Sequence, residues 1–265
     1  MRAASLCVLA LGPCFLWATA ASAQEWGDLT ATFVYDGPLP EESPLKVTTD
    51  IEFCGKFNLV DESLVVNPEN KGIANVFAYL YIGRRDDPPK VHPSYEASAK
   101  DEITVDNDKC RFDPHVAVLR TSQTLLMTNS DEVGHNCKVD TIINPPINYT
   151  IPAGGKLTHT FTDAERLPSR VSCSIHPWMS GWLLIKDNPY MAVSDEDGKL
   201  VIKNLPVGTW TIQFWQEKAG YVSDVVQAGT PTEWRRGRLE VTIEPGQNDV
   251  VILAVTVAID MMAHP

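Results

Sequence analysis

A cysteine, a histidine and a methionine lie close together in one short stretch of the chain, VSCSIHPWMSGWLLI. Cys173, His176 and Met179 are separated by two residues each, and a strand-like apolar run follows them. A thiolate and an imidazole bind borderline and soft metals, whereas a methionine thioether binds almost only soft metals, above all copper. Methionine is not among the usual ligands of zinc. The stretch therefore predicts a metal site, and Met179 favours copper over zinc.

A copper site of this kind needs a second histidine. Two histidines and a cysteine in a trigonal set, with a weak axial methionine, form the blue-copper sites that transfer electrons. Of the six histidines, His135 is the one that lies in a strand–turn–strand pattern of this kind, TNSDEVGHN. We therefore expect His135 to be the fourth ligand.

A zinc site is the alternative. Cys137 follows His135 by two residues, so both side chains would lie on the same face of a strand. His135, Cys137, Cys173 and His176 together would suit zinc, but this set would leave Met179 without a role. The other interpretation of Cys137 is a buried free thiol, which we favour.

Short strands bounded by turn residues must position these side chains. Segments such as SLVVN, IANVFAYLYIG and HVAVLR are rich in β-branched and aromatic residues, and KLTHTFT alternates. Helical periodicity is weak throughout. These patterns predict an all-β protein. The pattern starts afresh around KDNPY, which predicts a second small β-sandwich from about Asn188.

The first residues have the features of an export signal. Arg2 precedes the apolar run 3–18, and Ala21-Ser22-Ala23 forms a small-x-small cleavage site. We expect residues 1–23 to be removed, residues 24–187 to form the copper domain, and residues 188–265 to form the second sandwich. After cleavage we expect no membrane span, so the mature protein should be periplasmic or secreted.

The net charge limits the kinds of binding partner, and the positions of the cysteines suggest a disulfide. The net charge of −12 disfavours nucleic acid and anionic membranes, and it permits steering toward a basic partner. Cys54 and Cys110 lie outside the predicted ligand loops, and exported proteins can form disulfides. We predict that these two cysteines are joined.

The segment from Cys110 to Ile185 resembles the cupredoxin family, with TLLMTNSDEVGHN followed by VSCSIHPWMSGWLLI. The short C-x-x-H-x-x-M spacing is most similar to amicyanins. The resemblance implies a Greek-key β-sandwich with one type 1 copper held by His135, Cys173, His176 and Met179. It also implies that Asn136 ties the two ligand loops together near Ser174.

The C-terminal stretch DEDGKLVIKNLPVGTWTIQFWQEKAGY resembles carboxypeptidase regulatory-like domains, which have a transthyretin-like fold. The resemblance implies a non-catalytic module that is structural or binds a partner. Trp210, Trp215 and Trp234 could line a carbohydrate platform, but aromatic residues on strands more often pack in the core.

These observations predict an exported blue copper protein that carries single electrons between redox partners and is not itself an enzyme. No catalytic residues are expected, because no second copper cluster with its own histidines is visible. The alternative is a protein of two β-sandwiches that binds carbohydrate or another partner, with a structural zinc site or a vestigial copper site. Trp178 could line an exposed docking rim or pack the ligand loop, and the sequence leaves both open.

Overall fold

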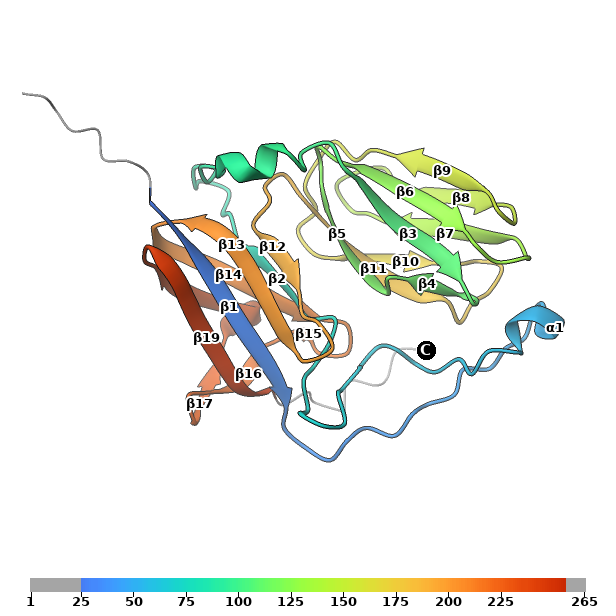
Figure 1. Ribbon diagram of the computed structural model, residues 1–265, viewed down its shortest axis with the longest axis horizontal. Coiled ribbons are helices and arrows are strands. Elements are labelled where there is room, and N and C mark those ends of the chain that lie inside the picture. The colour runs from blue at the N-terminus through green and yellow to red at the C-terminus, as the bar shows by residue number, and fades with distance from the viewer. Residues whose placement is uncertain (1–24, 256–265) are drawn as a thin grey trace, which may run out of the picture.

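The computed structural model describes residues 25–255, so the expected signal segment 1–23 lies outside the described residues. The described chain is nearly all β, which confirms the predicted fold class. Its strands form two β-sandwiches that lie side by side (Figure 1). No helix among the described residues is long and apolar enough to cross a membrane.

One sandwich, here called the metal-site sandwich, has a core of alternating apolar side chains. Along β6, Leu125 and Met127 are buried while Thr124, Leu126 and Thr128 are half-buried. They pack with Val139 and Ile185 from the facing sheet. One sheet has the order β5 (Val116–Arg120), β11 (Ser180–Lys186), β10 (Ser169–Ser172), β7 (His135–Asp140), β8 (Ile147–Ile151), and the other β4 (Arg111–Asp113), β3 (Glu102–Asp108), β6 (Thr124–Asn129), β9 (Lys156–His159).

The other sandwich, here called the terminal sandwich, contains both the first and the last strands of the described chain. Its core includes Phe33, Leu200, Phe214 and Trp234, all nearly inaccessible to solvent. One sheet has the order β13 (Lys199–Pro206), β1 (Trp26–Tyr35), β19 (Gly246–Val255), β16 (Asp224–Gln227), β17 (Thr230–Glu233), and the other β12 (Met191–Val193), β2 (Phe77–Leu80), β14 (Gly208–Gln216), β15 (Gly220–Tyr221), with β18 (Arg238–Ile243) also paired to β14.

The division into domains differs from the one expected from the sequence. β1 pairs with β13 and β19, and β2 pairs with β12 and β14, so both early strands belong to the terminal sandwich. Assigning all of residues 24–187 to the copper domain, with 188–265 as a separate unit, is therefore wrong. Alternating polar and apolar residues show that a strand has a buried face, but they do not identify the strands with which it pairs.

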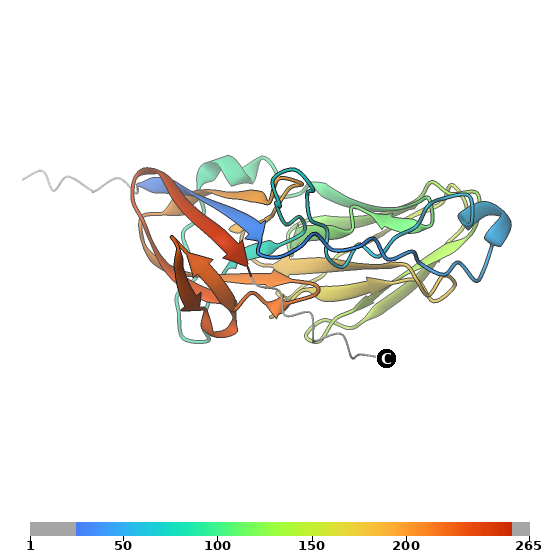
Figure 2. The same ribbon diagram turned by 90° about the horizontal axis from the view of Figure 1, so that it is seen from below.

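Between β1 and β2 the chain makes a long excursion, residues 36–76, which we call the strap. It leaves the terminal sandwich, runs beside the metal-site sandwich to the short helix α1 (Ile51–Cys54), and returns (Figures 1 and 2). A disulfide between Cys54 and Cys110 ties α1 to the turn between β3 and β4. Phe53 and Phe57 of the strap pack against the core of the metal-site sandwich.

A third apolar cluster joins the two sandwiches. The ring of Trp215 in β14 lies 4.6 Å from that of Trp182 in β11 and 5.9 Å from that of Phe77 in β2. Trp215 and Trp234 are buried, and the half-buried Trp210 donates to the carbonyl of Pro206. These tryptophans pack within the protein and do not form the exposed carbohydrate platform that the sequence left open.

The remaining short helices lie in connecting segments. One 3-10 turn, η1 (Pro93–Glu96), is in the connection from β2 to β3. The other, η2 (Arg235–Gly237), precedes β18 and contains Arg236 in the left-handed region, with a φ of 57°.

Candidate metal centre

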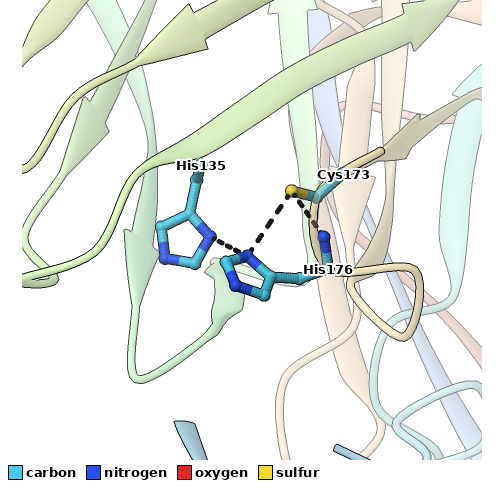
Figure 3. Close-up of side chains that lie close together, drawn as sticks. All are labelled: His135, Cys173 and His176. Carbon is cyan, nitrogen blue, oxygen red and sulfur yellow. Dashed lines mark hydrogen bonds between the residues drawn. The ribbon is translucent and has the colours of Figure 1, made fainter. Parts of the chain in front are cut away.

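Three potential metal ligands converge at one end of the metal-site sandwich (Figure 3). The Nδ1 atoms of His135 and His176 are 2.9 Å apart, and the Sγ atom of Cys173 lies 3.8 Å from Nδ1 of His176. His135 and His176 are wholly inaccessible to solvent, and Cys173 is 2% exposed. Two imidazole nitrogens and a thiol sulfur therefore face one another in a water-excluded space.

The backbone explains how this group is brought together. His135 opens β7, and β7 pairs with β10, whose end leads directly to Cys173. The loop from β10 to β11 is closed by two hydrogen bonds, from the N–H of Cys173 to the carbonyl of Met179 and from the N–H of Met179 to the carbonyl of His176. Pro177, inside this loop, has a fixed φ that further restricts it.

Asn136 connects the strand that carries His135 to the loop that carries the other two side chains. Its Oδ1 accepts from the N–H of Ser174 at 2.6 Å and from that of Ile175 at 3.3 Å. Its backbone N–H donates to Sγ of Cys173 at 3.4 Å. The structure thus places Asn136 and Ser174 in the contact that the family resemblance implies.

The surroundings of Cys173 favour its thiolate. Burial alone would raise the pKa of this thiol, but hydrogen bonds from His135 and from neighbouring backbone N–H groups outweigh burial and lower the pKa. One of these donors is the N–H of His176, 3.3 Å from Sγ. A thiolate is the form of cysteine that binds metals.

Cys137 has the opposite character. Burial raises the pKa of its thiol to about 12, and the residue is a free cysteine in the apolar core. It is not part of the His135–Cys173–His176 group. The zinc set that would include Cys137 is therefore not assembled among the described residues, and the structure agrees with a buried free thiol.

Each histidine is held by a carboxylate on its outer nitrogen. The Nε2 atom of His135 lies 2.8 Å from an oxygen of Asp131, and that of His176 lies 2.8 Å from an oxygen of Asp50. With Nε2 occupied by the carboxylate contact, Nδ1 of each ring is the nitrogen that can bind a metal once it carries no proton.

The surroundings shift the pKa values of the two histidines in opposite directions. Burial acts to lower the pKa of His135, but the hydrogen bond that its imidazole donates to Asp131, together with the interaction with Cys173, outweighs burial and raises the pKa to about 9. Burial lowers the pKa of His176, and the Asp50 contact offsets only part of this effect. Sequence reasoning missed both carboxylates. Asp131 lies four residues before His135 and could have been noticed, whereas Asp50 lies 126 residues from His176.

Met179 and Trp178 also belong to the loop between β10 and β11. Met179 is 1% exposed and belongs to the core of the metal-site sandwich. The ring of Trp178 lies 5.0 Å from that of His176, and its indole N–H donates to the carbonyl of Cys110. Trp178 thus packs the ligand loop against the disulfide-bonded turn.

Comparisons with known proteins give structural similarity over part of the chain. No family model and no curated protein matches. A mutant of amicyanin is similar at 19% identity over 32% of this chain and 82% of its own, with a TM-score of 0.29. A purple cupredoxin from Nitrosopumilus maritimus matches at 21% identity over 31% of this chain and 98% of its own, with a TM-score of 0.27. A copper-containing nitrite reductase from Thermus scotoductus matches at 21% identity over 40% of this chain and 25% of its own, with a TM-score of 0.29.

Proposed function

We propose that this chain is an exported type 1 copper protein that carries single electrons, with copper held by His135, Cys173, His176 and Met179. The observation that supports this most directly is the convergence of two Nδ1 atoms and one Sγ atom in a buried space. Two imidazoles, one thiolate and the thioether of Met179, which we propose as the fourth ligand, form the donor set that selects copper.

The side chains of the chain itself prepare the site. Asp131 and Asp50 fix the imidazole orientations, and Asn136 holds the thiol loop against β7. Burial excludes water, which strengthens these electrostatic contacts. Copper would supply a one-electron couple, and a scaffold fixed in advance lowers the reorganisation that accompanies each transfer. In this proposal, these contacts hold the ligands in place before the metal binds.

Several parts of the proposal concern the surroundings of the protein. The Cys54–Cys110 disulfide is consistent with an oxidising compartment, so we place the protein in the periplasm or outside the cell. Its partner would be a redox protein, and the net charge of −12 favours one with a basic surface. We propose that the protein is not itself an enzyme. We also propose that the terminal sandwich has the carboxypeptidase regulatory-like fold and that its role is structural or partner-binding.

The test is the visible and paramagnetic spectrum of the protein loaded with Cu(II). We expect intense blue thiolate-to-copper absorption and a narrow parallel hyperfine splitting. Met179→Gln should retain copper and shift the reduction potential, because the weak axial ligand tunes that potential. A colourless Cu(II) adduct, or preferential tight binding of zinc, would contradict the proposal.

A further inference from the structure

We propose that a cleft between the two sandwiches binds a small ligand that carries two or more carboxylate or phosphate groups. The cleft has a volume of about 620 Å³. This volume is within the usual range of small-molecule sites. The argument does not involve the metal centre, because no residue of the metal group lines the cleft.

Both sandwiches contribute walls to the cleft. The metal-site sandwich supplies the loop 164–167, the last residue of β11, Lys186, and the residues 187–188 that follow it. The terminal sandwich supplies 79–82 from β2 and its following loop, together with side chains from β14, β15, η2 and β18. Because the buried tryptophan cluster around Trp215 holds the sandwiches together, the walls are fixed relative to one another.

The cleft is strongly cationic in a protein that is strongly acidic. Two acidic residues, Glu165 and Asp187, line it, against five cationic residues: Arg84, Arg166, Lys186, Arg236 and Arg238. The whole chain has a net charge of −12. A local reversal of sign of this kind attracts anions to one place on the surface.

The arginines of the cleft are not paired with carboxylates. Among the ion pairs of the described chain, none involves any of the four arginines. Glu165 is occupied elsewhere, because its oxygens accept from the backbone N–H groups of 142–144. Asp187 accepts from the side chain of Asn188. Four guanidinium groups therefore remain available to a ligand.

Two of the cations are held rigidly. The guanidinium of Arg238 lies 3.5 Å from the ring centroid of Tyr81, and its buried Nε has no hydrogen-bond partner. The ammonium of Lys186 lies 4.2 Å from the ring of Tyr79 and donates to the carbonyl of Glu165. The protein therefore leaves part of the hydrogen-bonding capacity of Arg238 unfilled, which is costly for a buried donor.

Arg236 adds a backbone feature. Its φ of 57° lies in the left-handed region, which residues other than glycine rarely adopt. The buried side chain of Gln213 donates to its carbonyl at 2.9 Å and so holds this conformation. Residues kept in such conformations are concentrated at ligand-binding sites, which agrees with a role for Arg236 in binding.

The ligand class follows from this geometry. Guanidinium groups bind carboxylates and phosphates through two parallel hydrogen bonds. Several arginines spread around one cleft favour a ligand with more than one such group. The tyrosine rings of Tyr79 and Tyr81 are already covered by cations, so charge is the main feature that the cleft can recognise.

The test is isothermal titration calorimetry, which measures the affinity of the metal-free protein for each probe at pH 7 and 150 mM salt. The carboxylate probes are citrate and digalacturonate, and the phosphate probe is tripolyphosphate. Maltose serves as the neutral control and sulfate as the single-anion control. We expect at least one multivalent probe to bind with a dissociation constant below about 1 mM, and at least about tenfold more tightly than sulfate. The better probe identifies which oxyanion the cleft prefers.

Substitutions of single arginines test where on the protein the probes bind. Arg84→Gln and Arg236→Gln change exposed side chains, so the fold should persist, and each should weaken binding by about tenfold or more. Arg170→Gln removes an exposed arginine of β10 outside the cleft and should leave affinity within about twofold. Equal weakening in all three variants, sulfate binding as tight as the best probe, or no binding below about 1 mM would overturn the proposal. Cys173→Ala should not alter probe binding, so this result is independent of the copper proposal.

Discussion

The carboxylate of Asp50 lies 2.8 Å from Nε2 of His176, although the two residues are 126 positions apart in the chain. His176 comes from the ligand loop, whereas Asp50 comes from the strap beside α1. The His176 side chain is wholly buried, while that of Asp50 is 40% exposed. The candidate metal centre is thus completed by a segment that connects two strands of the other sandwich.

We predict that Asp50→Asn raises the reduction potential of the copper-loaded protein. A carboxylate on the outer nitrogen makes the imidazole a stronger donor and favours Cu(II), and an amide at this position removes the charge. Because Asp50 is partly exposed, we expect a shift of roughly 30 mV, which corresponds to about 0.7 kcal/mol. Spectroelectrochemical titration measures it.

Glu52→Gln is the matched control, since it removes the same charge two residues away on the exposed side of α1. It should shift the potential by much less than Asp50→Asn. Equal shifts would mean that the strap acts only through its overall charge.

We predict that replacing Cys54 and Cys110 together by serine lowers stability without removing the metal. The disulfide joins residues 56 positions apart, so its loss should cost about 4 kcal/mol through greater freedom of the unfolded chain. Denaturant unfolding of the metal-free proteins gives this difference. The proposed copper ligands lie on the metal-site sandwich, so the blue absorption should survive.

Limited proteolysis offers a second readout of that variant. With α1 released, cleavage within the strap, residues 36–76, should become faster. An unchanged unfolding free energy together with an unchanged cleavage rate would contradict the anchoring role of the disulfide.

We predict opposite outcomes for Cys173 and Cys137, the two free cysteines of residues 25–255. Cys173→Ala should abolish the thiolate-to-copper absorption, because this thiol faces both histidines and has a lowered pKa. Cys137→Ala should leave the absorption unchanged, because its thiol has a pKa of about 12 and lies in the apolar core. Absorption that persisted in Cys173→Ala would show that another thiolate binds copper.

We predict that Lys186 makes stability depend on pH. Burial lowers the pKa of this lysine to about 8, below the 10.5 of an exposed lysine. Between these values the unfolded chain binds more protons than the folded chain, so the free energy of unfolding should rise from pH 8 to about 10. Below pH 8 Lys186 is protonated in both the folded and the unfolded chain, so it adds no pH dependence to the free energy of unfolding.

Denaturant titrations at several pH values compare the wild type with Lys186→Met, whose apolar side chain can occupy the same space against Tyr79. The variant should lose the rise between pH 8 and about 10. An identical slope in both proteins would show that Lys186 does not have a depressed pKa.

Sequence patterns predicted the structure correctly where residues that are close in the chain are also close in space. Alternation predicted the β class correctly, because the period of a strand is visible in its own residues. Cys173, His176 and Met179 lie within one loop that is closed by its own hydrogen bonds, and their spacing predicted the convergence of Cys173 and His176.

Sequence alone therefore determined the strand content, the candidate donor types and the short loop that holds Cys173, His176 and Met179. Tertiary structure decided the partners: β1 and β2 joined the terminal sandwich, Asp50 reached His176, and arginines from separate segments gathered in one cleft. The physical reason is that a residue pattern reports which face of a strand avoids water, whereas contacts between distant segments depend on how whole sheets pack.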